Sequence, residues 1–438
     1  MIQSSGAERQ DARLCPTVDA VNDVAVIGLG YVGLPLVREA CRSGMRVLGF
    51  DVSQSVIEGL SRGFSHVDDV GTADVAAMLA SGLTVSSDPE TLASAQTIVI
   101  CVPTPLDTDG RPDLSAVTAA GRMVGPRLRT GVLVVLESTT YPGTTDEVLR
   151  PLLEEGSGLR AGTDFSLAFS PERIWPGNGQ YGVKNTPKVV GGYTPGCTRA
   201  AEAFYASMVD EVVTARGTRE AEMAKLLENT YRHVNIALVN EMAVFCNELD
   251  IDLWDAIACA GTKPFGFQSF YPGPGVGGHC IPIDPNYLSY RVRRLGYPFR
   301  FVELAQEINE RMPGYVVHRV QDLLNERRLP VADAEVLLLG VTYKPDITDI
   351  RESPAEPVVR GLRRLHAKVS FHDPHVDELV VDGEPVPRVE ELATALSSAD
   401  ISVLLQDHTS YLDGGLTAAK LLFDTRGRHK RGKDIEVL

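Results

Sequence analysis

The stretch VAVIGLGYVG, residues 24–33, decides how the first half of the chain folds. Its first four residues are apolar, as in a buried strand, and the glycine pattern G-x-G-x-x-G follows at once. Residues 34–43 then have the pattern of a helix, and residues 45–50 that of a second strand ending at Asp51. This order of strand, glycine turn, helix, strand and acid predicts a doubly wound α/β domain that binds a dinucleotide.

The glycines of this turn have separate predicted roles at a dinucleotide. Gly28 permits the tight turn, Gly30 lets the backbone approach the pyrophosphate, and Gly33 lets helix and strand pack closely. Asp51 would accept a hydrogen bond from a ribose 2′-hydroxyl and repel a 2′-phosphate, so NAD is favoured over NADP. The residues predicted to bind the cofactor here are Gly28, Gly30, Tyr31, Val32, Gly33 and Asp51.

Polar residues follow three further predicted strands, at residues 97–102, 132–136 and 165–169. Ligands bind at the carboxyl ends of parallel strands, so Thr104 and Thr139 are expected to line the cofactor cleft. The alternative for each is a local hydroxyl cap. Glu172 and Arg173 follow the third strand as an adjacent acid and base. They indicate a site there, or else a surface ion pair.

A long helix without proline or glycine is predicted from residue 218 to about residue 249. Lys225 and Asn229 are one turn apart on it, and His233 lies on nearly the same face. This polar stripe is a candidate catalytic surface, although a lysine on a helix is more often a solvated charge. Such a helix after a dinucleotide domain is also a common dimerisation element. Its apolar side is predicted to hold Met223, Leu226, Leu227, Val234, Ala237, Leu238 and Met242.

The glycine-rich stretch GPGVGGHCIPIDP, residues 273–285, carries one cysteine, Cys280, and one acid, Asp284. A thiol among glycines can be approached by a bulky substrate, and a nearby carboxylate can hold a water or accept a proton. The alternative is a tight turn with an inert, buried thiol. His279 beside Cys280 is no metal signature, because no second pair supplies further ligands. We therefore predict no metal.

A second doubly wound unit without its own glycine motif is predicted in the last third of the chain. Its expected strands are residues 335–340, 368–371, 401–405 and 421–424. Lys344, Arg351 and Arg426 lie at strand ends or in the loops after them, where they could hold a nucleotide. They could equally be surface charges. The predicted domains are a tail (residues 1–22), a dinucleotide domain (23–215), a helical dimerisation domain with the cysteine loop (216–312) and a nucleotide-binding domain (313–438).

Net charge, the length of apolar runs and cysteine spacing exclude several classes of function. The 438 residues carry a net charge of −16, which argues against a general nucleic-acid or anionic-membrane binder. No apolar run is long enough to span a bilayer, and residues 1–22 lack the apolar core of a secretory signal. The seven cysteines are widely spaced without a C-x-x-C pair, which favours free thiols in a reducing cytoplasm.

The order of these motifs resembles the UDP-glucose/GDP-mannose dehydrogenase family from Val24 to about Arg426, most specifically in residues 275–285. The resemblance implies two Rossmann-like domains joined by a long central helix and a helical middle domain. It also implies a four-electron, NAD-dependent oxidation of a sugar C6 alcohol to a carboxylate. The partners implied are a UDP-sugar and a second copy of the chain, with the long helix at the interface.

Roles for individual residues follow from the same resemblance. Cys280 would be the nucleophile that forms a thiohemiacetal and then a thioester. Lys225 and Asn229 would stabilise the oxyanions, while Asp284, with Thr139 and Glu172, would position or activate water. Arg351 would join Thr104 and Thr139 at the cofactor. The residues expected to bind substrate are Glu172, Arg173, Lys225, Asn229, His233, Tyr271, Gly277, Lys344 and Arg426.

Two departures bear on the substrate. Pro176 stands where the UDP-glucose branch has a second glutamate, and the cysteine follows histidine rather than serine. Both features, and the run from Lys263 to Gly275, resemble enzymes acting on UDP-N-acetylhexosamines, most of all UDP-N-acetylglucosamine. Lys263 is a candidate replacement for an arginine that relatives contribute across the dimer. The alternatives are UDP-glucose or UDP-N-acetylmannosamine as substrate, a two-electron hydroxyacid dehydrogenase, and a silent nucleotide-binding scaffold.

Overall fold

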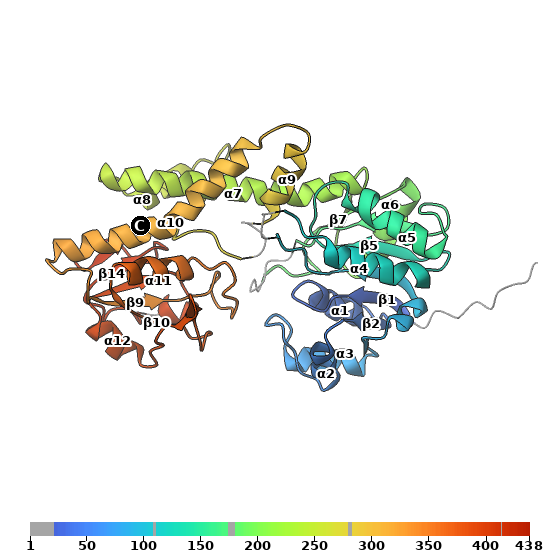
Figure 1. Ribbon diagram of the computed structural model, residues 1–438, viewed down its shortest axis with the longest axis horizontal. Coiled ribbons are helices and arrows are strands. Elements are labelled where there is room, and N and C mark those ends of the chain that lie inside the picture. Colours follow the sequence, from blue (N-terminus) through green and yellow to red (C-terminus); the bar gives the residue numbers. More distant parts are fainter. Residues whose placement is uncertain (1–21, 108–110, 174–179, 279–282, 413) are drawn as a thin grey trace, which may run out of the picture.

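The structure is a computed structural model that describes residues 22–107, 111–173, 180–278, 283–412 and 414–438 (Figure 1). Two α/β units lie at opposite ends of the molecule, and helix α7 (Thr218–Glu248) reaches from one to the other. Helix α10 (Arg300–Glu326) packs on α7 and leads into the second unit. The predicted fold class, α/β with two doubly wound units and a long central helix, is confirmed.

The N-terminal sheet has eight strands in the order β3-β2-β1-β4-β5-β6-β7-β8, and all neighbouring pairs are parallel except β6 and β7. The strands are β1 (Asn22–Ile27), β2 (Val47–Phe50), β3 (Thr84–Ser86), β4 (Ala95–Ile100), β5 (Leu133–Leu136), β6 (Ser166–Phe169), β7 (Lys188–Gly192) and β8 (Val212–Thr214). The connections reverse direction between β1 and β4, which is where nucleotides bind in open α/β sheets.

Helices cover both faces of this sheet because its central strands are apolar on both sides. Helices α1 (Gly33–Arg42), α2 (Gln54–Ser61), α3 (Thr72–Ala80) and α6 (Pro195–Ala206) pack on one face. The other face carries η1 (Pro89–Ser94), α4 (Ser115–Val124), η2 (Gly125–Arg127), the π-helical turn η3 (Thr145–Leu149) and α5 (Arg150–Ser157). Polar loops at the carboxyl edge are thereby left facing α7.

The C-terminal sheet has five parallel strands in the order β10-β9-β13-β14-β15. They are β9 (Glu335–Leu339), β10 (Lys368–His372), β13 (Ile401–Leu404), β14 (Leu422–Asp424) and β15 (Ile435–Val437), with a small hairpin of β11 (Val380–Val381) and β12 (Glu384–Pro385). Helices α10 and α11 (Ala355–Arg364) cover one face, and α12 (Leu392–Ser398) with α13 (Thr409–Leu412) the other.

The middle of the chain is helical, as predicted. Helices α8 (Leu253–Gly261) and α9 (Asp284–Arg293) both pack against α7. The predicted boundary at residue 312 falls inside α10, so this helix serves the middle and the C-terminal parts together. Within the described residues, no helix combines the length and apolar content that crossing a bilayer requires.

The predicted apolar side of α7 is wrong in part. Leu227 is 59% exposed and Leu238 is 53% exposed, whereas Lys225, His233 and Asn240 are buried. The buried side of this helix mixes apolar and polar residues: Leu226 packs with Tyr287 and Leu288, whereas the polar residues meet loops and the Asn309 side chain of α10. Burial of the outward apolar face by a second copy stays a prediction.

Candidate functional site

The glycine turn after β1 fits a dinucleotide pyrophosphate. A Cβ on Gly28, whose φ is +91°, would lie 2.5 Å from the Cys101 carbonyl oxygen, and one on Gly33 would lie 1.8 Å from that of Gly28. At Gly30, by contrast, no heavy atom would come within 4 Å of a Cβ. The backbone there faces open space at the start of α1, as a phosphate requires. The residues present therefore fit NAD.

The acid that ends β2 is already tied to this turn. Asp51 Oδ2 accepts a hydrogen bond from the Leu29 backbone nitrogen at 2.9 Å, and Oδ1 accepts from Ser53 N at 2.8 Å. The carboxylate is thus fixed beside the glycine turn, where a ribose hydroxyl could still donate to its remaining lone pairs. Val32 is the N-cap residue of α1.

The second α/β unit reaches this cofactor turn through one loop. The Arg351 guanidinium lies 5.5 Å from the centroid of the Tyr31 ring, and its charge is paired with Asp349 at 2.6 Å. The Thr348 hydroxyl donates to Asp68 of the N-terminal unit at 2.7 Å. The predicted cofactor residues Tyr31 and Arg351 are therefore brought together from opposite ends of the chain.

Four predicted catalytic residues meet where α7 crosses the carboxyl edge of the N-terminal sheet. Lys225 Nζ donates to the Glu172 backbone oxygen at 2.6 Å and lies 3.4 Å from the Glu172 carboxylate, directly after β6. One turn along α7, the Asn229 amide donates to Asp284 Oδ2 at 2.5 Å, at the first residue of α9. An ammonium, an amide and two carboxylates thus form two contacting pairs, and the charges of Lys225 and Glu172 both act on Asp284.

Burial controls the acid–base character of this cluster. Asp284 is 3% exposed, and its burial raises the pKa of the carboxyl to about 7, against the lowering effects of Lys225 and the Asn229 hydrogen bond. The nearby charge of Glu172 also contributes to this upward shift of the pKa. A carboxyl that titrates near neutrality can both take and return a proton there.

The loop after β5 supplies two adjacent threonines. The buried Thr104 hydroxyl donates to the Thr139 carbonyl oxygen at 2.8 Å, so the loops after β4 and β5 are joined. Thr139 itself is partly exposed. The Thr140 hydroxyl is buried and has no hydrogen-bond partner in the part of the chain that the structure describes. Sequence reasoning chose Thr139, and no signal in the sequence distinguished the two.

His233, another predicted substrate residue, is buried between α7 and α10. Its Nδ1 lies 3.4 Å from the Asn309 amide, and burial lowers its pKa to about 4, so the ring is neutral at neutral pH. Asn309 Oδ1 accepts from Asn240, whose own oxygen accepts from the Gly273 backbone nitrogen at 2.9 Å. This pair of asparagines ties the glycine-rich loop to both long helices, which sequence reasoning missed.

The glycine-rich loop packs into the C-terminal unit. A Cβ on Gly277 would lie 2.6 Å from the Glu352 carbonyl oxygen and 2.7 Å from the Tyr343 Cβ, so only glycine fits. The Gly278 backbone nitrogen donates to the Arg351 carbonyl oxygen at 3.2 Å. Cys280 lies outside the described residues, as do His279 and Pro176. Gly278 and Asp284, which flank this segment in the sequence, contact the C-terminal loop and Asn229, respectively.

The remaining predicted substrate residues are spread around these loops. Arg173 pairs with Glu228 of α7 at 2.8 Å, and half-exposed Tyr271 stacks on Trp254 at a centroid distance of 5.2 Å. Lys344 lies over the Tyr343 ring. Arg426 is half-buried, its Nη1 would lie 3.3 Å from a Cβ placed on Gly273, and desolvation of the guanidinium lowers its pKa.

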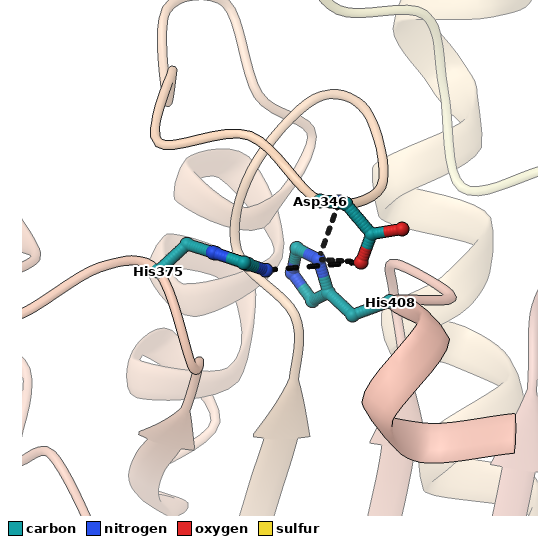
Figure 2. A group of neighbouring side chains, drawn as sticks. All are labelled: Asp346, His375 and His408. Carbon is teal, nitrogen blue, oxygen red and sulfur yellow. Dashed lines mark hydrogen bonds and ion pairs between the residues drawn. The ribbon is translucent and has the colours of Figure 1, made fainter. Parts of the chain in front are cut away.

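Asp346, His375 and His408 form a separate cluster at the carboxyl ends of β9, β10 and β13 (Figure 2). The Asp346 carboxylate lies 3.7 Å from His375 Nε2 and 3.8 Å from His408 Nδ1. However, His408 Nδ1 accepts from the Asp346 backbone nitrogen at 2.9 Å, and Nε2 lies 3.0 Å from Asp373 Oδ2. Both ring nitrogens are therefore committed, so this cluster holds its loops in place rather than binding a metal.

Family comparisons match most of the chain. The NAD binding domain of the UDP-glucose/GDP-mannose dehydrogenase family matches residues 22–209, its central domain residues 219–311, and its UDP binding domain residues 337–431. The chain is 38% identical to the UDP-N-acetyl-D-glucosamine 6-dehydrogenase of Pseudomonas aeruginosa, over 81% of this chain and 83% of that protein.

Other relatives carry different sugar names. The chain is 34% identical to the NDP-N-acetyl-D-galactosaminuronic acid dehydrogenase of Ralstonia solanacearum, over 92% of this chain and 95% of that protein. Among solved structures, the UDP-D-ManNAc dehydrogenase of Pyrococcus horikoshii aligns with a TM-score of 0.86 at 33% identity, covering 95% of this chain and 98% of that one.

Proposed function

The chain belongs to the UDP-glucose/GDP-mannose dehydrogenase family, and from that premise we propose that it oxidises the C6 hydroxyl of UDP-N-acetylglucosamine to a carboxylate. It is an NAD-dependent oxidoreductase of the UDP-N-acetylhexosamine type. The choice of N-acetylglucosamine is supported by the run from Lys263 to Gly275 and by the 38% identical relative of that name.

The observation that carries the proposal is the meeting of Lys225, Asn229, Glu172 and Asp284 beside the glycine-rich loop. An ammonium and an amide can stabilise a negative oxygen, and a carboxyl with a pKa near 7 can handle protons. Four-electron oxidation of an alcohol needs these groups and also a nucleophile. Cys280, inside that loop, is the residue we propose for that role.

We assign the domains accordingly. Residues 23–215 bind NAD, residues 216–312 bring the catalytic groups together, and residues 313–438 hold the UDP moiety through Lys344 and Arg426. In a cytoplasmic homodimer, a second copy covers the outward apolar face of α7, on which Leu227 and Leu238 lie. Lys263 is positioned in the sequence to replace the arginine that relatives supply across this interface.

In the first oxidation, Lys225 donates a hydrogen bond to the C6 oxygen as the hydroxyl loses its proton and C6 loses a hydride. NAD supplies the hydride acceptor at each of the two oxidations. Asn229 stays oriented because its amide is fixed on Asp284. The product of this step is a C6 aldehyde, one proton and one NADH.

In the second half of the reaction, the Cys280 thiolate adds to the aldehyde carbon. The resulting thiohemiacetal still carries a hydrogen on C6, so its loss as a second hydride leaves a thioester. Asp284 then accepts a proton from water, with Glu172 and a threonine hydroxyl, Thr139 or Thr140, orienting that water. Hydrolysis breaks the carbon–sulfur bond and releases the carboxylate and the free thiol.

The hydrolysis step is expected to depend on pH through Asp284. The carboxyl must be ionised to accept a proton, and its pKa is about 7, so the single-turnover hydrolysis rate should rise through pH 7 and level off above it. Below the pKa, each pH unit should cost about tenfold in that rate. The Asp284→Asn variant should hydrolyse the thioester slowly at every pH. A hydrolysis rate within about threefold of the native rate would contradict the role of Asp284 as proton acceptor.

A side-by-side assay of NADH formation with UDP-GlcNAc, UDP-ManNAc and UDP-glucose tests the proposed substrate. We expect kcat/KM to be highest for UDP-GlcNAc, by at least about tenfold over UDP-glucose, because an N-acetyl pocket leaves polar groups unpaired when the group is missing. Preference for UDP-ManNAc would correct the C2 stereochemistry only. No turnover with any UDP-sugar would favour the silent scaffold.

A further inference from the structure

Glu222, near the start of α7, is a buried carboxylate that the proposed reaction leaves unused. It has no exposed surface, and both of its oxygens accept hydrogen bonds. Oε2 accepts from the Gly143 backbone nitrogen at 2.5 Å. Oε1 accepts from the backbone nitrogen of Thr145 at 2.9 Å and from its hydroxyl at 2.8 Å. One side chain thus satisfies three donors of a single loop.

These donors belong to the loop that follows β5 and carries the two threonines of the site. Thr145 is the first residue of η3, so Glu222 caps the helical segment that continues into α5. The other end of the loop is tied to β4: the Ser138 hydroxyl donates to the Val102 carbonyl oxygen at 2.7 Å, and Thr104 holds Thr139. Thr139 and Thr140 lie between these two attachments.

Glu222 is also one helical turn before Lys225. Residues three and seven apart on a helix share a face, so Glu222, Lys225 and Asn229 project together. They contact the loop after β5, the loop after β6 and the start of α9, respectively. A shift or rotation of α7 at Glu222 would therefore move the ammonium and the amide relative to the threonines.

We propose that Glu222 is a positioning residue that sets the place of α7, and so of Lys225 and Asn229, against the threonine loop. This rests on the proposed function, in which those groups act on the same C6 carbon. An ammonium that must meet a developing oxyanion has little tolerance for displacement, because a shift of about 1 Å can cost a hundredfold in rate.

The electrostatic surroundings show that Glu222 is costly to keep. Burial, with a smaller contribution from the nearby charge of Asp146, raises the pKa of its carboxyl to about 7. In the described residues no salt bridge joins Glu222 to a cation. Arg219 of α7 pairs with Asp146 and Glu147, and Arg291 of α9 also pairs with Glu147. Three hydrogen bonds thus offset the cost of burying this carboxylate, and no directly bonded cation is seen to share that role among the described residues.

The test compares Glu222→Gln with Glu220→Gln, which removes an exposed carboxylate from the same helical turn. Glutamine has one acceptor oxygen, so the buried Gly143 nitrogen would face an amide donor and lose its partner. We expect kcat to fall about a hundredfold for Glu222→Gln while KM for NAD and sugar stay within about threefold. Glu222→Asp should recover part of kcat, and Thr145→Ala should lose about tenfold.

Hydrogen exchange of peptides from residues 138–149 keeps this test separate from the proposed function. Faster exchange in Glu222→Gln than in Glu220→Gln is expected, whatever substrate the enzyme takes. Equal exchange in the two variants would overturn the proposal. A Glu222→Gln enzyme with native kcat would also overturn it. The same holds if the loss of kcat is fully explained by a lowered melting temperature, that is, by a smaller fraction of folded protein. A native protein that oxidises no UDP-sugar would instead overturn the proposed function.

Discussion

Replacing Cys280 with serine is expected to stop the reaction after the first oxidation. A serine hydroxyl is almost wholly protonated at neutral pH and is a weak nucleophile, whereas a cysteine thiol has an accessible thiolate. Steady-state turnover should fall at least about a thousandfold, as for loss of a nucleophile in other covalent enzymes. NAD binding should be unchanged, because the glycine turn after β1 is untouched.

Rapid mixing of Cys280→Ser with substrate and NAD tests the nucleophile assignment, because it measures the NADH formed in the first turnover. We expect a burst of about one NADH per active site, followed by very slow turnover through a hydroxyl ester. Cys259→Ser is the matched control, because Cys259 is exposed on α8, outside the cluster around Lys225. Full turnover by Cys280→Ser would refute the nucleophile assignment.

Lys225→Met is expected to have the second-largest effect. Methionine nearly keeps the length and apolar stem of lysine but removes the ammonium that would face the C6 oxygen. Loss of one oxyanion donor costs about 10²–10³ in kcat. The variant also removes the Lys225 cation from beside the Glu172 carboxylate, whose side chain is only 12% exposed. Both oxidations should slow, since both develop charge on the same oxygen.

The control for this variant is Lys184→Met, which removes an exposed lysine from the N-terminal α/β unit. We expect Lys184→Met to keep native kcat and KM. Thermal unfolding of both variants will separate loss of charge from loss of fold. If Lys225→Met kept more than about a tenth of native kcat while folded, Lys225 would not be the oxyanion donor.

Most of the fold could be predicted from local sequence patterns. The glycine turn, Asp51 and the β/α alternation can each be recognised within a short stretch of sequence, because a strand, a turn and a helix depend on neighbouring residues. The Lys225–Asn229 spacing likewise follows from the helical repeat alone. The structure confirms these elements and adds the partners, such as Glu172, that lie 53 residues from Lys225 in the chain.

Features that depend on tertiary contacts could not be predicted from the sequence. Leu227 and Leu238 look like core residues by composition, yet both lie on the exposed side of α7, while Glu222 and Asn240 on its buried side accept hydrogen bonds from backbone nitrogens of two loops. Which of two adjacent threonines has a buried, unpaired hydroxyl likewise depends on loop geometry. Such choices depend on residues far away in the chain, so no local period reveals them.

The ratio of NADH formed to UDP-GlcNAc consumed, measured at completion with the product identified by mass, tests the central claim most directly. Four-electron oxidation predicts two NADH per sugar and a product heavier by the exchange of two C6 hydrogens for one oxygen. One NADH per sugar, with an aldehyde as product, would contradict the thioester route and leave a two-electron dehydrogenase.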